Sequence, residues 1–176
     1  LSNGQVVVAK HEYNLSYPND KRQIMPVVTY PLGESPIQLD PNGQAIKALS
    51  IQEGPSGTAI TAFTADGRLS YNLFESQTEF LTGETTLVRT DYQLPDAPKT
   101  VQKLLVDTRL QNLFVADDEG KVHYYDIREP ASARYVEAVS VVASGQDISA
   151  LEFLVGSVSL IIGSTDGNIS QWFLVR

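Results

Sequence analysis

The sequence has 176 residues, of which 42% are hydrophobic and 19% are charged. This length and composition are typical of one folded globular domain and exclude a disordered linker. The chain carries 13 basic and 21 acidic residues, a net charge of −8, and its longest basic run is the pair Lys21-Arg22. Nucleic acids and anionic membrane surfaces bind positive faces that displace counterions, so we expect no nucleic-acid partner.

Cysteine is absent, which excludes disulfides, thiolate metal sites and cysteine nucleophiles. The longest nearly apolar run, Leu151 to Gly163, includes Glu152 and is shorter than the roughly 20 residues that span a bilayer. We therefore expect that this segment does not itself enter the membrane. The chain begins at Leu1 and stops at Arg176 directly after a strand-like run, so we expect one domain, residues 1–176, excised from a longer protein.

The first predicted elements are short and separated by turns. Asn3-Gly4 precedes the apolar run Gln5–Val8, as a hairpin turn precedes a strand. Gln23–Tyr30 alternates as an outer fourth strand would. The run Pro31–Gly43 contains three prolines, each of which removes a backbone donor, and so indicates a connecting loop or a sheet edge.

Three later stretches are similar to one another: Ala45–Glu75, Thr100–Glu129 and Asp147–Arg176. Each holds an apolar run, a polar break, a second apolar run, an acidic-glycine turn and a third run with alternating apolar residues. Repeats of about 40–50 residues indicate a stacked or radial architecture. The alternation predicts strands at Ile46–Ile51, Ala59–Thr64, Arg68–Phe74, Thr85–Thr90, Val101–Val106, Asn112–Ala116, Lys121–Ile127, Arg134–Val142, Ile148–Leu154, Val158–Ser164 and Asn168–Val175.

The turns before the third strands share a glycine, which adopts a positive φ without steric penalty. The predicted turn residues are Gly4, Asp66, Gly67, Glu119, Gly120, Asp166 and Gly167. The predicted fold class is all-β: a partial β-propeller of about three and a half four-stranded antiparallel blades. Its predicted core residues are Leu49, Ile60, Ala62, Leu69, Leu105, Phe114, Val122, Leu151, Leu160, Ile162 and Ile169.

The third strands resemble those of WD-repeat propeller blades. After the turn Glu119-Gly120, the pair Tyr125-Asp126 occupies the position of the family's Trp-Asp pair. Trp172 takes the tryptophan position in the last repeat, but Phe173 replaces the aspartate, and Asn72-Leu73 matches neither residue. No repeat opens with the family's Gly-His pair, so the buried polar network of a complete WD blade is not expected here.

A narrower resemblance comes from Gly163–Arg176 together with Leu113–Gly120. These segments look like the large soluble, propeller-like insertion of some bacterial phosphate ABC-transporter permeases. The resemblance implies a non-catalytic interaction or sensory domain, periplasmic, on an inner-membrane importer. Its implied protein partner is the transporter core or a substrate-binding protein. The alternatives are a freestanding, cytoplasmic WD-like scaffold and a fragment of a propeller hydrolase.

No residue pattern predicts catalysis, and none predicts a cofactor or a metal site. The acidic run Asp117-Asp118-Glu119 lacks the spacing of a Ca²⁺ loop and is interpreted as a solvated turn. His11 and His123 have no partner at metal-binding spacing, and His123 is expected on the strand face away from the core.

Eight tyrosines favour packing between blades, but three of them flank polar turns. Tyr13, Tyr17 and Tyr92 are therefore predicted to be exposed and to form a possible interface. An open arc of blades also leaves sheet faces and edges uncovered, so a homodimer of the isolated domain is expected as one way to cover them.

Overall fold

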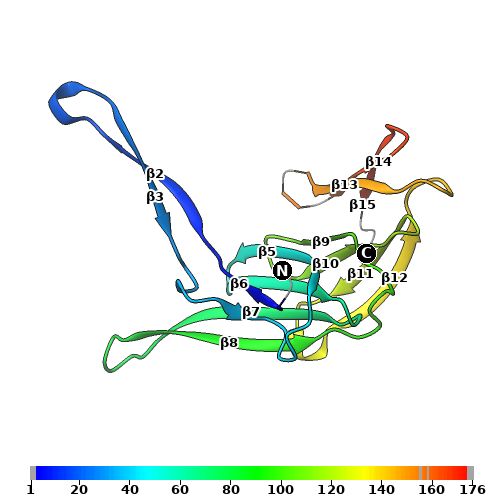
Figure 1. Cartoon of the computed structure of the whole chain (residues 1–176), viewed down its shortest axis with the longest axis horizontal. Coiled ribbons are helices and arrows are strands. Elements are labelled where there is room, and N and C mark those ends of the chain that lie inside the picture. Colours follow the sequence, from blue (N-terminus) through cyan, green and yellow to red (C-terminus); the bar gives the residue numbers. More distant parts are fainter. Residues whose placement is uncertain (1–2, 155, 158, 174–176) are drawn as a thin grey trace.

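The computed structural model describes residues 3–154, 156–157 and 159–173, and among these it contains strands and two short 3-10 turns but no α-helix (Figure 1). The 3-10 turns are η1 (Pro18–Asp20) and η2 (Pro130–Ser132). The strands are β1 (Gln5–Val6), β2 (Lys10–Ser16), β3 (Gln23–Thr29), β4 (Ile37–Gln38), β5 (Ile46–Gly54), β6 (Gly57–Thr64), β7 (Leu69–Thr78), β8 (Thr85–Gln93), β9 (Lys103–Val106), β10 (Asn112–Ala116), β11 (Lys121–Asp126), β12 (Arg134–Ser140), β13 (Ile148–Phe153), β14 (Ser159–Ser164) and β15 (Ile169–Phe173).

Three antiparallel sheets form the body of the molecule. The first has the order β5-β6-β7-β8, the second β9-β10-β11-β12 and the third β13-β14-β15, so each strand pairs with its neighbours in the sequence. The first strands of successive sheets lie together, because β9 contacts both β5 and β13. Sheets that turn about their first strands in this way are the blades of a propeller. The described sheets do not close a ring, so the fold is a partial β-propeller.

Apolar side chains fill the spaces between neighbouring sheets. Between the first and second sheets, Leu69 and Tyr71 of β7 pack with Leu113 and Val115 of β10 and with Tyr125 of β11. All five side chains are at most 1% exposed. A separate cluster fills the space between the second and third sheets. The β-branched and aromatic residues that alternate along these strands therefore stack the blades, as the period-2 pattern predicts.

The N-terminal segment covers the outer face of the first sheet. Val6 of β1 and Leu39, just after β4, pack against Ile60 and Phe74 of that sheet. Two polar contacts reinforce the packing: the Arg68 guanidinium pairs with the buried Asp40 carboxylate, and Arg89 Nη1 donates to the Gln38 carbonyl over 2.7 Å. Residues before the first blade are thereby attached to it.

Two N-terminal predictions were wrong. Gly4 has a φ of +71°, as predicted for a turn, but the strand after it is only Gln5–Val6 and pairs with Ile37–Gln38 rather than entering a four-stranded sheet. Gln23–Tyr30 is not the fourth strand of a blade either. Its residues 23–29 form β3, which pairs with β2 in a hairpin that stands away from the body (Figure 1).

The predicted core contains eight buried residues, one half-buried residue, Leu105, and two exposed ones. Leu49 is 43% exposed because Ile46 and Ala48 hold the buried positions of β5, next to an irregularity in its pairing with β6. Ile169 is 76% exposed on the outer strand of the third sheet. Parts of two predicted strands, Val158, Leu174 and Val175, lie outside the described residues.

Candidate functional site

The predicted hairpin turns lie at equivalent places in the three sheets. Gly67, Gly120 and Gly167 each have a φ between +75° and +86° and each precede a third strand. The residue three before each glycine closes the turn through its backbone N–H, which donates to the carbonyl of the residue directly after the glycine. The acidic members Asp66, Glu119 and Asp166 are exposed. The repeated turn is therefore a structural device that reverses the chain.

One of these turns carries a buried polar network. Asp117 Oδ1 accepts hydrogen bonds from the backbone N–H groups of Glu119 and Lys121, both over 2.9 Å. Asp117 Oδ2 lies 2.8 Å from His123 Nε2, and His123 Nδ1 lies 3.5 Å from the hydroxyl of Tyr135 on β12. The Asp117 and His123 side chains are only 6% and 12% exposed. The network joins the turn, β11 and β12.

This network corrects two expectations. Asp118 and Glu119 are exposed, as expected for a solvated turn, but Asp117 is buried. His123 lies on the face of β11 opposite Val122, but that face is not away from the core, because Tyr125 on the same face belongs to the core between the first and second sheets. A buried polar network is therefore present in the second blade although the Gly-His pair is absent. None of its three side chains lines the groove described next. We therefore interpret the network as a structural link within the blade.

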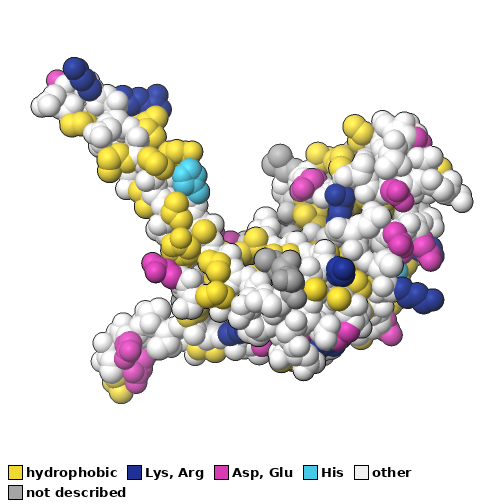
Figure 2. Space-filling model, in the orientation of Figure 1, with side chains coloured by type: hydrophobic (Ala, Val, Ile, Leu, Met, Phe, Trp, Pro, Cys, Tyr) yellow, Lys and Arg dark blue, Asp and Glu magenta, His cyan; other side chains and the backbone are white. Residues whose placement is uncertain are grey.

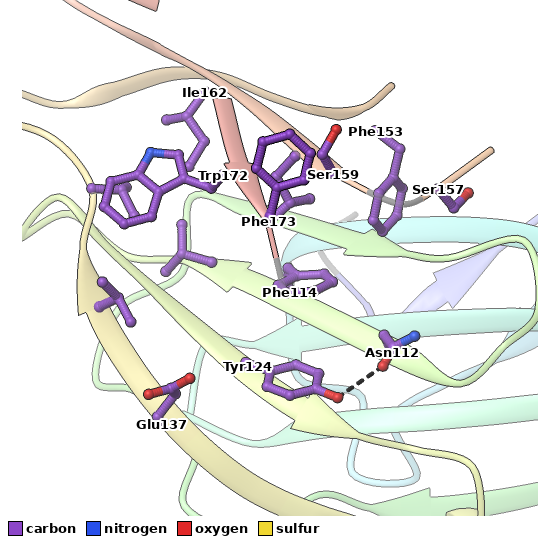
Figure 3. A pocket seen from close by; sticks show the side chains of 14 residues that line it. Asn112, Phe114, Tyr124, Glu137, Phe153, Ser157, Ser159, Ile162, Trp172 and Phe173 are labelled. Carbon is purple, nitrogen blue, oxygen red and sulfur yellow. Dashed lines mark hydrogen bonds between the residues drawn. The ribbon is translucent and has the colours of Figure 1, made fainter. Parts of the chain in front are cut away.

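An apolar groove separates the second and third sheets (Figure 3). We call it the inter-sheet groove; its volume is about 110 Å³. Its lining residues are Asn112, Phe114, Val122, Tyr124, Glu137, Val139, Val141, Phe153, Ser157, Ser159, Leu160, Ile162, Trp172 and Phe173.

Aromatic rings form the walls of the inter-sheet groove. Phe114 stacks on Tyr124 with ring centroids 5.2 Å apart and meets the edge of Phe153 across the groove at 5.7 Å. Trp172 and Phe173 of β15 form the opposite side (Figure 3). Phe173 is 61% exposed. Successive blades therefore touch at the floor of the groove but leave aromatic surface accessible toward its mouth.

Few polar groups reach the inter-sheet groove, and several are already paired. The Tyr124 hydroxyl donates to Asn112 Oδ1 over 2.8 Å, and Gln171 Nε2 donates to Ser159 Oγ over 3.0 Å. Among the described residues of the lining, Glu137 is the only carboxylate, and none is histidine, lysine or arginine. The groove can bind an apolar segment but offers no acid–base pair.

The outer strand of the third sheet borders this groove. β15 pairs with β14 through Phe173↔Ser159 to Ile169↔Gly163, and no described strand pairs with its other side. The first two sheets carry a fourth strand at the corresponding place, namely β8 and β12. An unpaired strand edge presents backbone N–H and C=O groups to an added strand. The edge and the groove are thus adjacent binding features.

The predicted interface tyrosines do not come together. Tyr13 and Tyr17 are 65% and 61% exposed on the β2–β3 hairpin. Tyr92 is half-buried instead of exposed, because it packs against the core with its ring centroid 6.3 Å from that of Tyr71. Sequence analysis missed the inter-sheet groove entirely. Its five aromatic lining residues lie on β10, β11, β13 and β15 and do not occupy equivalent positions of consecutive repeats, so the repeat pattern carried no signal for it.

Among the described residues we find no arrangement typical of a metal site or of a hydrolase site. No group of three or more histidine, aspartate or glutamate side chains is placed to hold a metal ion. A concave surface formed by first strands of the sheets includes Gln102, Lys103 and Ser149 but one carboxylate, Glu152, and no histidine. A hydrolase site on this surface would need several converging acids. Within the described part of the chain, no helix is long and apolar enough to cross a membrane.

The sheets and their contacts define a partial propeller, and two solved structures that resemble the chain are propellers. One solved structure, described as the Dos1 propeller, is 12% identical, with a TM-score of 0.46 over 85% of this chain and 36% of that chain. The Cps50 (Swd1) β-propeller domain of Myceliophteria thermophila is 9% identical, with a TM-score of 0.43 over 96% of this chain and 69% of that chain. This chain thus spans about a third of the first structure.

No family model matches the chain, and no curated protein is similar enough to match it. The assignment as a partial propeller follows from the strand order and from the contacts between first strands.

Proposed function

We propose that the chain is a non-catalytic protein-interaction module that binds an extended segment of a partner protein along β15 and in the inter-sheet groove. The observation that carries this proposal is the adjacency of an unpaired strand edge and an aromatic groove. A strand added to β15 forms main-chain hydrogen bonds, and every second side chain of that strand points toward the groove.

The chemistry of the groove favours a segment with alternating apolar residues. Phe153, Trp172 and Phe173 offer ring surface to apolar side chains, whereas Glu137 is the single charged group among the described lining residues. Burying apolar surface stabilises the complex by about 25 cal/mol per Å², and the main-chain pairing fixes the direction and register. Recognition would therefore depend more on the alternation of apolar and polar residues along the bound segment than on any single side chain.

Trp172 provides a direct test because it is the only tryptophan of the chain and lines the groove. The probe is a ten-residue peptide with alternating valine and threonine; its control replaces alternate residues with proline, which cannot form the ladder. We expect a saturable change in Trp172 fluorescence with the first peptide alone. The Phe173→Ser variant should bind at least about fivefold more weakly. An equal response to the proline peptide, or none to either, would contradict the proposal.

We further propose that this module belongs to a bacterial phosphate importer and faces the periplasm, with the transporter core or its substrate-binding protein as partner. The support is the sequence resemblance at Gly163–Arg176 and Leu113–Gly120. The described parts of these segments include β15 and β10, so the resemblance and the groove involve the same region.

Two measurements test this assignment. The coding sequence that contains this chain should encode several apolar stretches of about 20 residues, each long enough to span a bilayer. Overlapping peptides from that sequence and from the substrate-binding protein should include one that changes Trp172 fluorescence. A coding sequence without apolar spans would instead support the freestanding cytoplasmic scaffold.

A further inference from the structure

No other described part of the chain buries the hairpin formed by β2, η1 and β3, residues 10–29. We call it the arm. Every residue of the arm is exposed except Val27, which is half-buried. The arm stands away from the body, with apolar side chains along its length and basic side chains near its far end (Figure 2). A two-stranded hairpin is marginally stable in water without further packing, so packing against another surface would stabilise the arm.

The pairing register separates the arm into two unlike faces. Residues directly opposite one another in an antiparallel pair share a face, and the face alternates along the strand. The pairs His11↔Val28, Tyr13↔Pro26 and Leu15↔Ile24 therefore lie on one face. The pairs on the other face are mostly polar: Lys10↔Thr29, Glu12↔Val27, Asn14↔Met25 and Ser16↔Gln23.

The first of these faces is a continuous apolar surface in solvent. Tyr13 is 65% exposed, Val28 52%, Leu15 51% and Ile24 50%. The His11 and Tyr13 rings meet edge to face at 4.8 Å, which extends the apolar surface toward the base of the arm. Exposed apolar surface of this continuity marks an interaction site.

Charge identifies the surface that the arm prefers. Residues 10–29 contain three of the 13 basic residues, Lys10, Lys21 and Arg22, but only two of the 21 acidic ones, Glu12 and Asp20. The arm thus has a net charge of +1, whereas the rest of the chain has −9. Opposite charge attracts the arm to an acidic surface and gives no attraction between two arms. The rest of this chain, with its net charge of −9, is acidic on average and attracts the arm of a second copy.

The dimensions of the arm favour a reciprocal arrangement. Seven residue pairs at about 3.4 Å rise give a face about 24 Å long and about 10 Å wide. This footprint is well below the roughly 800 Å² per partner of a stable interface. A twofold arrangement, in which each copy both gives and receives an arm, doubles the contact and brings the bodies together.

We propose that two copies of this chain associate by reciprocal exchange of their arms, each laying its apolar face on the acidic body of the other. This inference is independent of the segment-binding function proposed for the groove. It makes the association salt-sensitive, because the attraction between the arm and the body is partly electrostatic.

Sedimentation velocity over a range of concentrations tests the proposal. We expect a dimer at low ionic strength whose dissociation constant rises with added salt. In the Leu15→Ser/Ile24→Ser variant, which removes one cross-strand pair from the apolar face, the dissociation constant should rise at least about tenfold. The matched control Asn14→Ser/Met25→Ser, one pair along on the opposite face, should leave it within about twofold. Circular dichroism should show the same strand content in both variants.

Carbodiimide coupling of a mixture of ¹⁴N- and ¹⁵N-labelled protein locates the contact. We expect mixed-isotope links from Lys10 or Lys21 to carboxylates of the body. The proposal is wrong if the protein stays monomeric, if the apolar-face variant dimerises normally, or if the mixed links join arm to arm. It is also wrong if the monomer instead binds vesicles containing phosphatidylglycerol and loses that binding in the apolar-face variant.

Discussion

His123 Nε2 lies 2.8 Å from Oδ2 of Asp117, and this contact joins a β10–β11 turn to the outer part of the second blade. The other carboxylate oxygen of Asp117 holds two backbone N–H groups of the turn. Removal of the carboxylate takes away the acceptor of these two part-buried N–H groups and the partner of His123. Asp117→Ala should therefore lower the free energy of unfolding by about 3 kcal/mol.

The control for this variant is Glu119→Gln, which changes an exposed carboxylate two residues further along the same turn. Its ion pair with Lys121 is exposed and screened by solvent, so the substitution should lower the free energy of unfolding far less than Asp117→Ala does. Urea denaturation of both variants provides the measurement. Equal losses would mean that the network does not hold the turn.

Asp126 predicts how stability depends on acid pH. Hydrogen bonds from the Arg128 side chain are the main cause that holds the pKa of Asp126 well below its usual range, with Arg134 also contributing. A lowered folded-state pKa gives stability that is fully present above about pH 4, the ordinary range of the unfolded chain, and that is lost as the pH falls further. Asp126→Asn should therefore weaken the protein at pH 7 and flatten its loss of stability in acid. Unchanged pH dependence in urea denaturation would be inconsistent with this role.

Tyr71 predicts the behaviour at alkaline pH. Burial between the first two blades, aided by Asp107, raises the pKa of Tyr71 to about 12. The neutral phenol is favoured in the folded state, so its contribution is intact below about pH 10 and declines as the pH rises toward 12. Tyr71→Phe should reduce the fall in the free energy of unfolding over this interval. Tyr13→Phe, at an exposed site, should have no such effect.

Two glycines with positive φ should differ in their tolerance of a methyl group. A Cβ at Gly57 would lie 2.2 Å from the Phe74 carbonyl oxygen, whereas a Cβ at Gly67 would meet nothing within 4 Å. Both substitutions strain the backbone by about 1–2 kcal/mol. Gly57→Ala adds a clash with the neighbouring strand and should lower the free energy of unfolding by about 3 kcal/mol or more. Thermal melts that rank Gly67→Ala as the more damaging change would refute this explanation.

The blades were predictable because their signals are local. A strand that alternates apolar and polar residues and follows an acidic-glycine turn specifies its own hairpin. β11 begins at the predicted Lys121, and β10, on the other side of the turn, begins and ends at the predicted residues. Which face of a strand is buried was less predictable. Leu49 and Ala48 are adjacent apolar residues, and only the irregular pairing of β5 with β6 decides which of them is buried.

The groove and the arm were not predictable from these local signals. The groove depends on how far the third sheet diverges from the second, which no single strand encodes. Gln23–Tyr30 had the composition of an outer strand, and its actual partner, β2, lies on the N-terminal side of a turn with positive φ at Asn19 and Asp20. Choosing between these partners requires tertiary information.

The pairing of β1 with β4 has a consequence for the evolution of the chain. Val6 lies opposite Ile37, next to the pair Gln5↔Gln38, so the backbone leaves the body and returns to it at one short ladder. The arm lies within this closed excursion, and the length of the excursion scarcely affects the entropy of closing it, since that entropy grows only slowly with loop length. The arm can therefore be lengthened, trimmed or replaced by a graft without disturbing the register of any blade, as long as Leu32 keeps its packing with Val6 and Leu39, which makes the arm a natural place for relatives of this chain to diverge.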